Sequence, residues 1–294
     1  MQHPDVTGFF DEDTNTVTYL VADPATGKAV VIDPAVRIDM VHATLSEGPL
    51  EPVVAAVAER GLEVVHILET HLHADHATGA PALKRRYGVP VGIGAGVRRN
   101  LPLFAGLYDA PDVPVDGSQF DRLFADGDSF DIGELTCRVM ETPGHTPGCV
   151  TYVIGDAAFV GDCLFMPDFG SARCDFPGGD ARTLYRSVRR ILDLPPETRL
   201  FTCHDYAPGG REIAWESTVA EQRRSNIHMA DGVDEASFVE MRATRDAGLS
   251  LPRLILPAVQ LNIRAGELPP AHDNGRRYIC LPIGNFEGAE ESRG

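Results

Sequence analysis

The segment Thr70-His-Leu-His-Ala-Asp-His76 places three histidines and an aspartate within six consecutive residues. It follows a nearly continuous apolar run from Glu63 that is typical of a buried strand. A loop that leaves such a strand can turn alternate imidazoles toward one point, and histidine with aspartate suits a borderline metal such as iron, manganese or zinc. A solvated histidine-rich turn is the alternative, but four such groups together argue against it. The segment therefore predicts a metal site at a strand end.

Three further polar residues follow strand-like stretches later in the chain. His145 lies in Thr142-Pro-Gly-His-Thr-Pro-Gly, Asp162 lies in Val160-Gly-Asp-Cys-Leu, and His204 lies in Phe201-Thr-Cys-His-Asp-Tyr. Imidazole and carboxylate are again the ligand types that these metals prefer. The sequence therefore predicts that these residues join the same site.

The pattern of strands and helices repeats along the chain. A hairpin is expected over residues 15–34, and strand, glycine turn and strand recur from residue 126. Further strands are expected at 63–70, 89–93, 149–154, 157–160 and 199–203, helices at 50–60, 81–87, 183–192, 212–224 and 237–247, and a proline-rich loop at 100–116. Two β-rich halves with helices outside predict an α/β fold, a four-layer αββα sandwich.

The length of 294 residues allows one or two domains. We expect a catalytic domain over residues 1–228. Residues 229–294 contain one expected helix and many prolines, a composition typical of a covering arm rather than of an independent core. We therefore expect a C-terminal extension that packs on the same domain.

The formal net charge of −17 excludes several classes of partner. Such a field repels phosphate backbones and anionic headgroups, so neither nucleic acid nor a membrane is expected as a partner. No apolar run approaches the ~18 residues that cross a bilayer, and the first Lys or Arg is Lys28, so no targeting segment is expected. The six cysteines form no CxxC pair, which fits reduced thiols. These features predict a cytoplasmic protein.

The order HxHxDH, then separate His, Asp and His, resembles the metallo-β-lactamase superfamily. In dinuclear members of that superfamily, the resemblance implies two metals bridged by Asp162. One metal would be held by His71, His73 and His145, and the other by Asp75, His76 and His204.

Four longer stretches resemble the persulfide dioxygenase family, also called sulfur dioxygenase or ethylmalonic encephalopathy protein-like, whose bacterial members include β-lactamase-like hydrolases. They are Thr142-Pro-Gly-His-Thr-Pro-Gly-Cys-Val-Thr-Tyr, Phe159-Val-Gly-Asp-Cys-Leu-Phe, Arg173-Cys-Asp-Phe-Pro-Gly-Gly and Thr183-Leu-Tyr-Arg-Ser-Val. The resemblance implies one Fe(II) per chain on His71, His145 and Asp162. It places His73, Asp75, His76 and His204 nearby without ligating the metal.

The activity that this resemblance implies is oxidation of glutathione persulfide with O₂ and water to sulfite and glutathione, in a homodimer. Two histidines and one carboxylate on one face of Fe(II) leave positions open for substrate sulfur and O₂. Because glutathione carries two carboxylates, an acidic protein needs a local cationic pocket. The candidates for this pocket are Arg173, Tyr206, Arg211, Arg223 and Arg224. For Arg173, a structural ion pair with Asp175 is the alternative.

Rival functions come from other classes. A glyoxalase II-like hydrolase would use all seven ligands to hold two metals and a hydroxide that attacks a glutathione thioester. A noncatalytic iron or redox sensor would need a partner surface that the sequence does not show. A nuclease is disfavoured by the net charge of −17.

Overall fold

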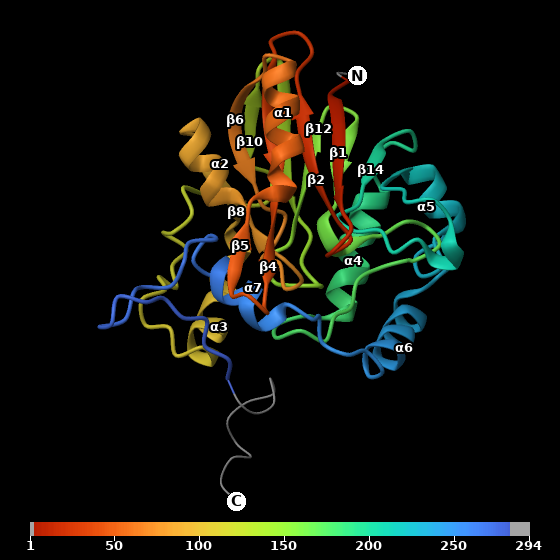
Figure 1. Cartoon of the computed structure of the whole chain (residues 1–294). Coiled ribbons are helices and arrows are strands. Elements are labelled where there is room, and N and C mark those ends of the chain that lie inside the picture. The colour runs from red at the N-terminus through yellow and green to blue at the C-terminus, as the bar shows by residue number, and fades with distance from the viewer. Residues whose placement is uncertain (1–2, 283–294) are drawn as a thin grey trace, which may run out of the picture.

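Two six-stranded sheets lie face to face at the centre of the protein (Figure 1), in a computed structural model that describes residues 3–282. The first sheet runs in the order β1 (Asp5–Asp11), β2 (Thr16–Ala22), β3 (Lys28–Ile32), β6 (Glu63–Leu68), β8 (Val91–Gly94) and β9 (Arg122–Phe124). The second runs in the order β10 (Ser129–Ile132), β11 (Leu135–Glu141), β12 (Val150–Ile154), β13 (Ala157–Phe159), β14 (Arg199–Phe201) and β15 (Glu216–Thr218). A small third sheet contains β5 (Thr44–Ser46), β4 (Ala35–Asp39) and β7 (Ala77–Thr78).

Helices cover the outer face of each large sheet. They are α1 (Glu51–Glu59), α2 (Ala80–Tyr87), α3 (Leu101–Leu107), α4 (Ala181–Leu192), α5 (Val219–Ser225), α6 (Glu235–Asp246) and α7 (Ile255–Asn262). In β2, Tyr19 and Val21 face the second sheet, whereas Leu20 and Ala22 face the helices of the first. This alternation is what a strand buried on both faces requires. The chain therefore has four layers in the order αββα, as the sequence predicts.

Several segments differ from the sequence-based expectation. The predicted loop at 100–116 contains α3, because Pro102 occupies the first helical turn, where its missing N–H leaves no hydrogen bond unmade. The helix predicted at 212–224 begins only at Val219. Residues Glu216–Thr218 instead form β15 beside β14, and the Thr218 hydroxyl caps α5 by accepting a hydrogen bond from the Glu221 amide.

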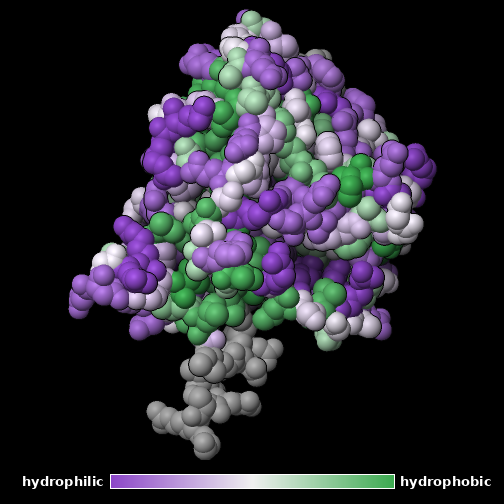
Figure 2. Space-filling model, viewed as in Figure 1, coloured by the Kyte–Doolittle hydropathy of each residue, from purple (hydrophilic) through white to green (hydrophobic). Residues whose placement is uncertain are grey.

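The C-terminal segment packs on the first sheet's side of the molecule. Within the stretch predicted as a proline-rich tail, α7 buries Ile255, Val259 and Leu261 in the core formed by α1, α2 and the first sheet. Residues 283–294 of the predicted extension lie outside the described residues, and the boundary at residue 228 stays a prediction. Figure 2 shows apolar side chains gathered around α7 and the ends of β4 and β5. Every helix within residues 3–282 is too short or too polar to cross a membrane.

Candidate metal centre

The predicted ligands meet where strands of both sheets end. His71 follows β6 of the first sheet, whereas His145 follows β11 and Asp162 follows β13 of the second. His204 follows β14, which pairs in parallel with β13. Residues far apart in the sequence therefore reach one point between the sheets, as the sequence predicts.

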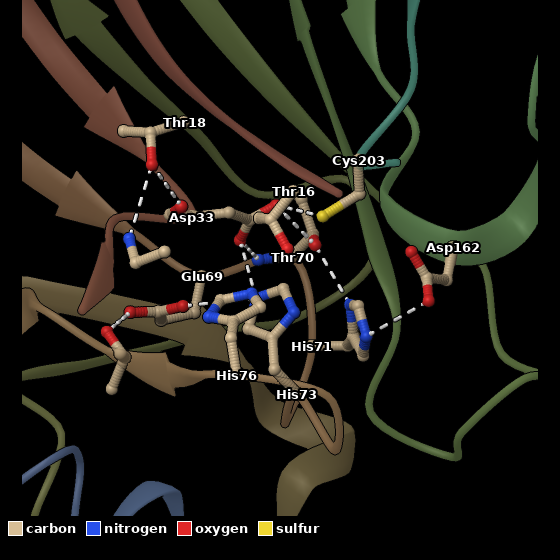
Figure 3. Close-up of polar contacts among 12 residues, drawn as sticks. Thr16, Thr18, Asp33, Glu69, Thr70, His71, His73, His76, Asp162 and Cys203 are labelled. Carbon is tan, nitrogen blue, oxygen red and sulfur yellow. Dashed lines mark hydrogen bonds and ion pairs between the residues drawn. The ribbon is translucent and has the colours of Figure 1, made fainter. Parts of the chain in front are cut away.

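His71, His145 and Asp162 form one compact group at the expected metal position. One ligand atom from each lies within 4.8 Å of the others, and all three side chains are buried. Asp162 Oδ2 lies 3.8 Å from His71 Nε2 (Figure 3) and 3.7 Å from His145 Nε2. Two imidazoles and one carboxylate thus surround a space of the size that a metal ion needs.

His204 and Asp75 lie on the other side of Asp162. His204 Nε2 is 3.4 Å from Asp162 Oδ1 and 3.2 Å from Asp75 Oδ2. The ring of His76 lies 6.3 Å from that of His204, measured between centroids. The carboxylate of Asp162 therefore faces both groups of histidines.

Five buried histidines each use one ring nitrogen for a hydrogen bond to an oxygen, at 2.8–3.2 Å. They are His71, His73, His76, His145 and His204. Outer contacts of this kind fix ring orientation and direct the other nitrogen toward a metal. Nε2 of His71, His76 and His204, Nδ1 of His73 and Oδ1 of Asp162 are buried without a hydrogen-bond partner. Since unpaired buried polar atoms are costly, this donor set fits a metal ion.

The protonation of His71 and His76 also suits metal binding. Burial, with neighbouring imidazoles, lowers the pKa of His71 well below its ordinary value and that of His76 to about 4. Both rings are therefore neutral at physiological pH and have a lone pair available. Burial alone would lower the pKa of His204, but Asp75 and Asp162 raise it well above the usual range. A cation between these groups would take the place of that proton.

Asp33 organises the base of the site and was not identified from the sequence. Its carboxylate accepts hydrogen bonds from the Thr70 amide (2.7 Å), the Thr70 hydroxyl (2.8 Å) and His73 Nε2 (3.0 Å) (Figure 3). The Thr70 oxygen in turn accepts from His71 Nδ1 at 3.0 Å. Glu69 lies 3.3 Å from His73 Nε2. The sequence signal that could have identified Asp33 is its position directly after a buried strand.

A cavity of about 460 Å³ opens beside the metal position. His145 and Asp162 form part of its wall, together with Tyr206 and Arg173. Arg173 also forms a bidentate ion pair with Asp175 and donates to the carbonyl of Ser250. The structural ion pair considered in the sequence analysis is therefore present, and Arg173 lines the cavity as well.

The other predicted arginines lie elsewhere. Arg211 is paired with Asp168 and Asp205 and does not line this cavity. Arg223 and Arg224 line a separate surface cavity.

Three arginines outside the predicted set reach the main cavity from the C-terminal segment: Arg242, Arg245 and Arg253. Arg242 is buried against Asp246, whereas among residues 3–282 neither Arg245 nor Arg253 has an ion-pair partner. No local motif marks these two residues, because they reach the site only through the folding of α6 and the turn before α7.

The fold and the ligand order define the class of protein. Residues 11–204 match the metallo-beta-lactamase superfamily, and the chain belongs to that superfamily. A probable metallo-hydrolase of Burkholderia pseudomallei is 50% identical over 289 residues, covering 95% of this chain and 98% of that protein. A protein of Dictyostelium discoideum named Glyoxylase B2 is 45% identical over 278 residues, covering 94% and 95%.

Relatives named as dioxygenases are also similar to the chain. The mitochondrial persulfide dioxygenase ETHE1 of Bos taurus is 34% identical over 266 residues, which cover 89% of each protein. The crystal structure of ETHE1 from Myxococcus xanthus superposes with a TM-score of 0.70 at 32% identity, covering 90% of this chain and all of that one. The comparisons thus include both hydrolase and dioxygenase names within one superfamily.

Proposed function

We propose that this protein is a persulfide dioxygenase that oxidises glutathione persulfide at one Fe(II) per chain. The observation that carries the proposal is the close grouping of His71, His145 and Asp162. Two histidines and one carboxylate are the ligand set typical of non-haem Fe(II) oxygenases. Similarity to the persulfide dioxygenase of Bos taurus supports the same reaction.

The side chains around this set prepare it for iron. Fe(II), when bound, would supply the electrons and adjacent open positions that a reaction between O₂ and a sulfur substrate needs. His145 donates its Nδ1 hydrogen to the Arg173 carbonyl at 2.8 Å, which leaves the Nε2 lone pair directed at the site. His71 is held in the same tautomer by Thr70.

Tyr206 and the unpaired arginines would receive the substrate. Burial raises the pKa of Tyr206 to about 12, so its hydroxyl stays protonated and can donate a hydrogen bond into the cavity. Arg245 and Arg253 line the same cavity and offer guanidinium groups to the two carboxylates of glutathione. The cationic pocket that an acidic protein needs is thus assigned to the C-terminal segment together with Arg173.

The decisive experiment measures O₂ consumption by iron-loaded protein given glutathione persulfide. We expect one O₂ to be consumed per persulfide, with sulfite and glutathione as products, according to GSSH + O₂ + H₂O → GSH + SO₃²⁻ + 2H⁺. Metal analysis should find close to one iron per chain. Sulfite formation without O₂, or no sulfite from a fully loaded protein, would refute the proposal.

A dinuclear hydrolase of glutathione thioesters is the second candidate. It is favoured by the unpartnered nitrogens of His76 and His204 beside Asp75, and by the similarity to Glyoxylase B2. Its bridging hydroxide would attack the thioester carbonyl. Two metals per chain and thioester hydrolysis that does not depend on O₂ would establish this alternative. The homodimer and the cytoplasmic location stay predictions, to be tested by sedimentation and by cell fractionation.

A further inference from the structure

The side chain of Asn262 contacts the backbone of the loop that carries the candidate ligands His71, His73, Asp75 and His76. This residue lies in the last turn of α7 and is 3% exposed. Its Nδ2 donates to the carbonyls of His73 and His76, each at 2.8 Å, and its Oδ1 accepts from the Thr78 amide at 2.9 Å. Both amide hydrogens and the oxygen are therefore used on one short stretch of backbone.

That stretch has little regular structure of its own. Residues 71–76 form neither helix nor strand, and regular pairing resumes only at β7. Four of the seven candidate ligands lie on this loop. Hydrogen bonds from a side chain outside the loop are therefore well placed to set the direction in which the imidazoles point.

The helix that carries Asn262 is anchored in the hydrophobic core. Ile255, Val259 and Leu261 bury α7 in the core beside α1 and α2. Because a buried helix is held by packing along its length, its amide can act as a fixed anchor for the irregular loop, whose Leu72 and Ala74 contact the same core. The C-terminal segment thus reaches the loop of candidate ligands through the side chain of Asn262.

The same helix carries a second buried amide with a similar set of contacts elsewhere. Gln260 is 3% exposed, and its Oε1 accepts from the Cys280 amide at 2.9 Å while its Nε2 donates to the Cys280 carbonyl. It therefore also holds a stretch of backbone through both amide functions. Since none of these contacts touches residues 71–78, Gln260 is a matched control.

We propose that Asn262 is a positioning residue of the metal centre. It holds the His73 and His76 carbonyls so that the imidazoles of the loop point toward the metal position. This inference requires that the loop binds a metal, but not that the reaction is persulfide oxidation. The C-terminal segment is accordingly part of the metal centre rather than a cover alone.

The test compares Asn262→Asp with Gln260→Glu in the full chain. The aspartate can still accept from Thr78, but it loses both donors and places a negative charge against two carbonyl oxygens. We expect Asn262→Asp to weaken Co²⁺ binding by roughly 10 to 100-fold, as loss of an outer contact typically does. The measurement is chelator competition, with the Co²⁺ absorption spectrum as a second readout of ligand geometry. Gln260→Glu should leave both affinity and spectrum unchanged.

Thermal unfolding of the metal-free variants separates positioning from general stability. We expect both substitutions to lower the melting temperature, and only Asn262→Asp to alter Co²⁺ binding. Wild-type affinity and spectrum in Asn262→Asp, or equal weakening in both variants, would overturn the proposal. If Asn262→Asp does not fold, Asn262→Ser decides, because its shorter side chain cannot reach the two carbonyls and adds no charge, so it should weaken Co²⁺ binding by roughly 10-fold. Normal metal binding without persulfide oxidation would refute the proposed function while leaving the role of Asn262 intact.

Discussion

Asp162 has two carboxylate oxygens that face different neighbours. Oδ2 lies 3.7–3.8 Å from the Nε2 atoms of His71 and His145, and Oδ1 lies 3.4 Å from that of His204. A single metal would be held by His71, His145 and Asp162, whereas a second metal would also need Asp75, His76 and His204. The number of metals therefore depends on whether His204, His76 and Asp75 take part.

Substitutions at single ligands distinguish these two arrangements. His145→Ala and Asp162→Ala should lose iron and activity together, because each removes a ligand from the closest group. His204→Ala and Asp75→Ala should keep most of the iron and lower turnover by roughly 10 to 100-fold. Metal analysis of the four purified variants is the measurement. Equal iron loss in all four would contradict a mononuclear centre.

Arg245 and Arg253 should contribute to the recognition of glutathione. Both line the cavity without an ion-pair partner among the described residues, and both are exposed, so solvent screens part of their charge. Arg245→Ala and Arg253→Ala should each raise KM for glutathione persulfide by about fivefold with little change in kcat. Arg224→Ala, in the separate cavity, is the control. An unchanged KM in both cavity variants would show that the tripeptide binds elsewhere.

Sequence motifs locate the residues that meet between the sheets better than the residues that line the cavity beside them. The ligand candidates follow strand ends within recognisable short motifs, and the fold brings them together. Arg245 and Arg253 could not be predicted, since no spacing or motif relates them to His71. Their contribution depends on where the C-terminal segment packs, and this is a long-range property of the fold.

At the scale of elements, the turn that carries His145 is packed tightly against α4. Gly144 has φ +140°, and a Cβ there would lie 2.3 Å from the backbone of Leu184. Gly144→Ala should therefore lower the free energy of unfolding by more than about 2 kcal/mol and also reduce metal content. Gly106→Ala, in α3 with no atom near the added Cβ, should stabilise by about 0.5–1 kcal/mol. Denaturant unfolding measures both, and a neutral Gly144→Ala would show that α4 can shift.

His228 links the segment before α6 to the wall of the cavity, where its Nδ1 accepts from the Ser171 amide at 3.0 Å. Burial, with Arg242 and Arg245, lowers its pKa to about 4, against about 6.5 in an unfolded chain. Between these values the unfolded state binds the extra proton, so the free energy of unfolding falls as pH drops from about 6.5 to about 4.

His228→Asn should reduce this loss of stability, because the amide oxygen can still accept from Ser171 but takes up no proton. Urea unfolding of wild type and variant at about pH 5 and about pH 7 measures the difference. A variant that loses as much stability as wild type would show that His228 is not responsible.

Most helices and strands agree with the periodicity of the sequence, and the exceptions have separate causes. In α3 and α7, Pro102 and Pro257 lie in the first turn, where proline is tolerated, although a proline-rich stretch is by composition typical of a loop or tail. In β15, three residues of strand precede α5, and a strand this short has no periodicity of its own. Its pairing with β14 is a tertiary contact.

At the scale of the whole molecule, the four layers depend on the C-terminal segment. The first core includes Leu254, Ile255, Ala258, Val259 and Leu261 together with α1 and α2. An apolar cluster that is shared in this way does not divide into two independent units. The predicted extension therefore contributes to the first core, and a truncation can test whether the fold needs this contribution.

A chain that ends at residue 228 should fail to reach the native state, because removing α7 uncovers the apolar side chains of α2 and the first sheet. We expect it to bind a hydrophobic dye strongly, to lose its cooperative thermal transition and to hold no metal. A chain that ends at residue 268 keeps α6, α7 and the Asn262 contact, so it should retain a cooperative transition and bind metal. Dye fluorescence, calorimetry and metal analysis of the two chains check this. If the shorter chain melts cooperatively and binds one metal, residues 1–228 form a complete domain and the C-terminal segment is dispensable for the fold.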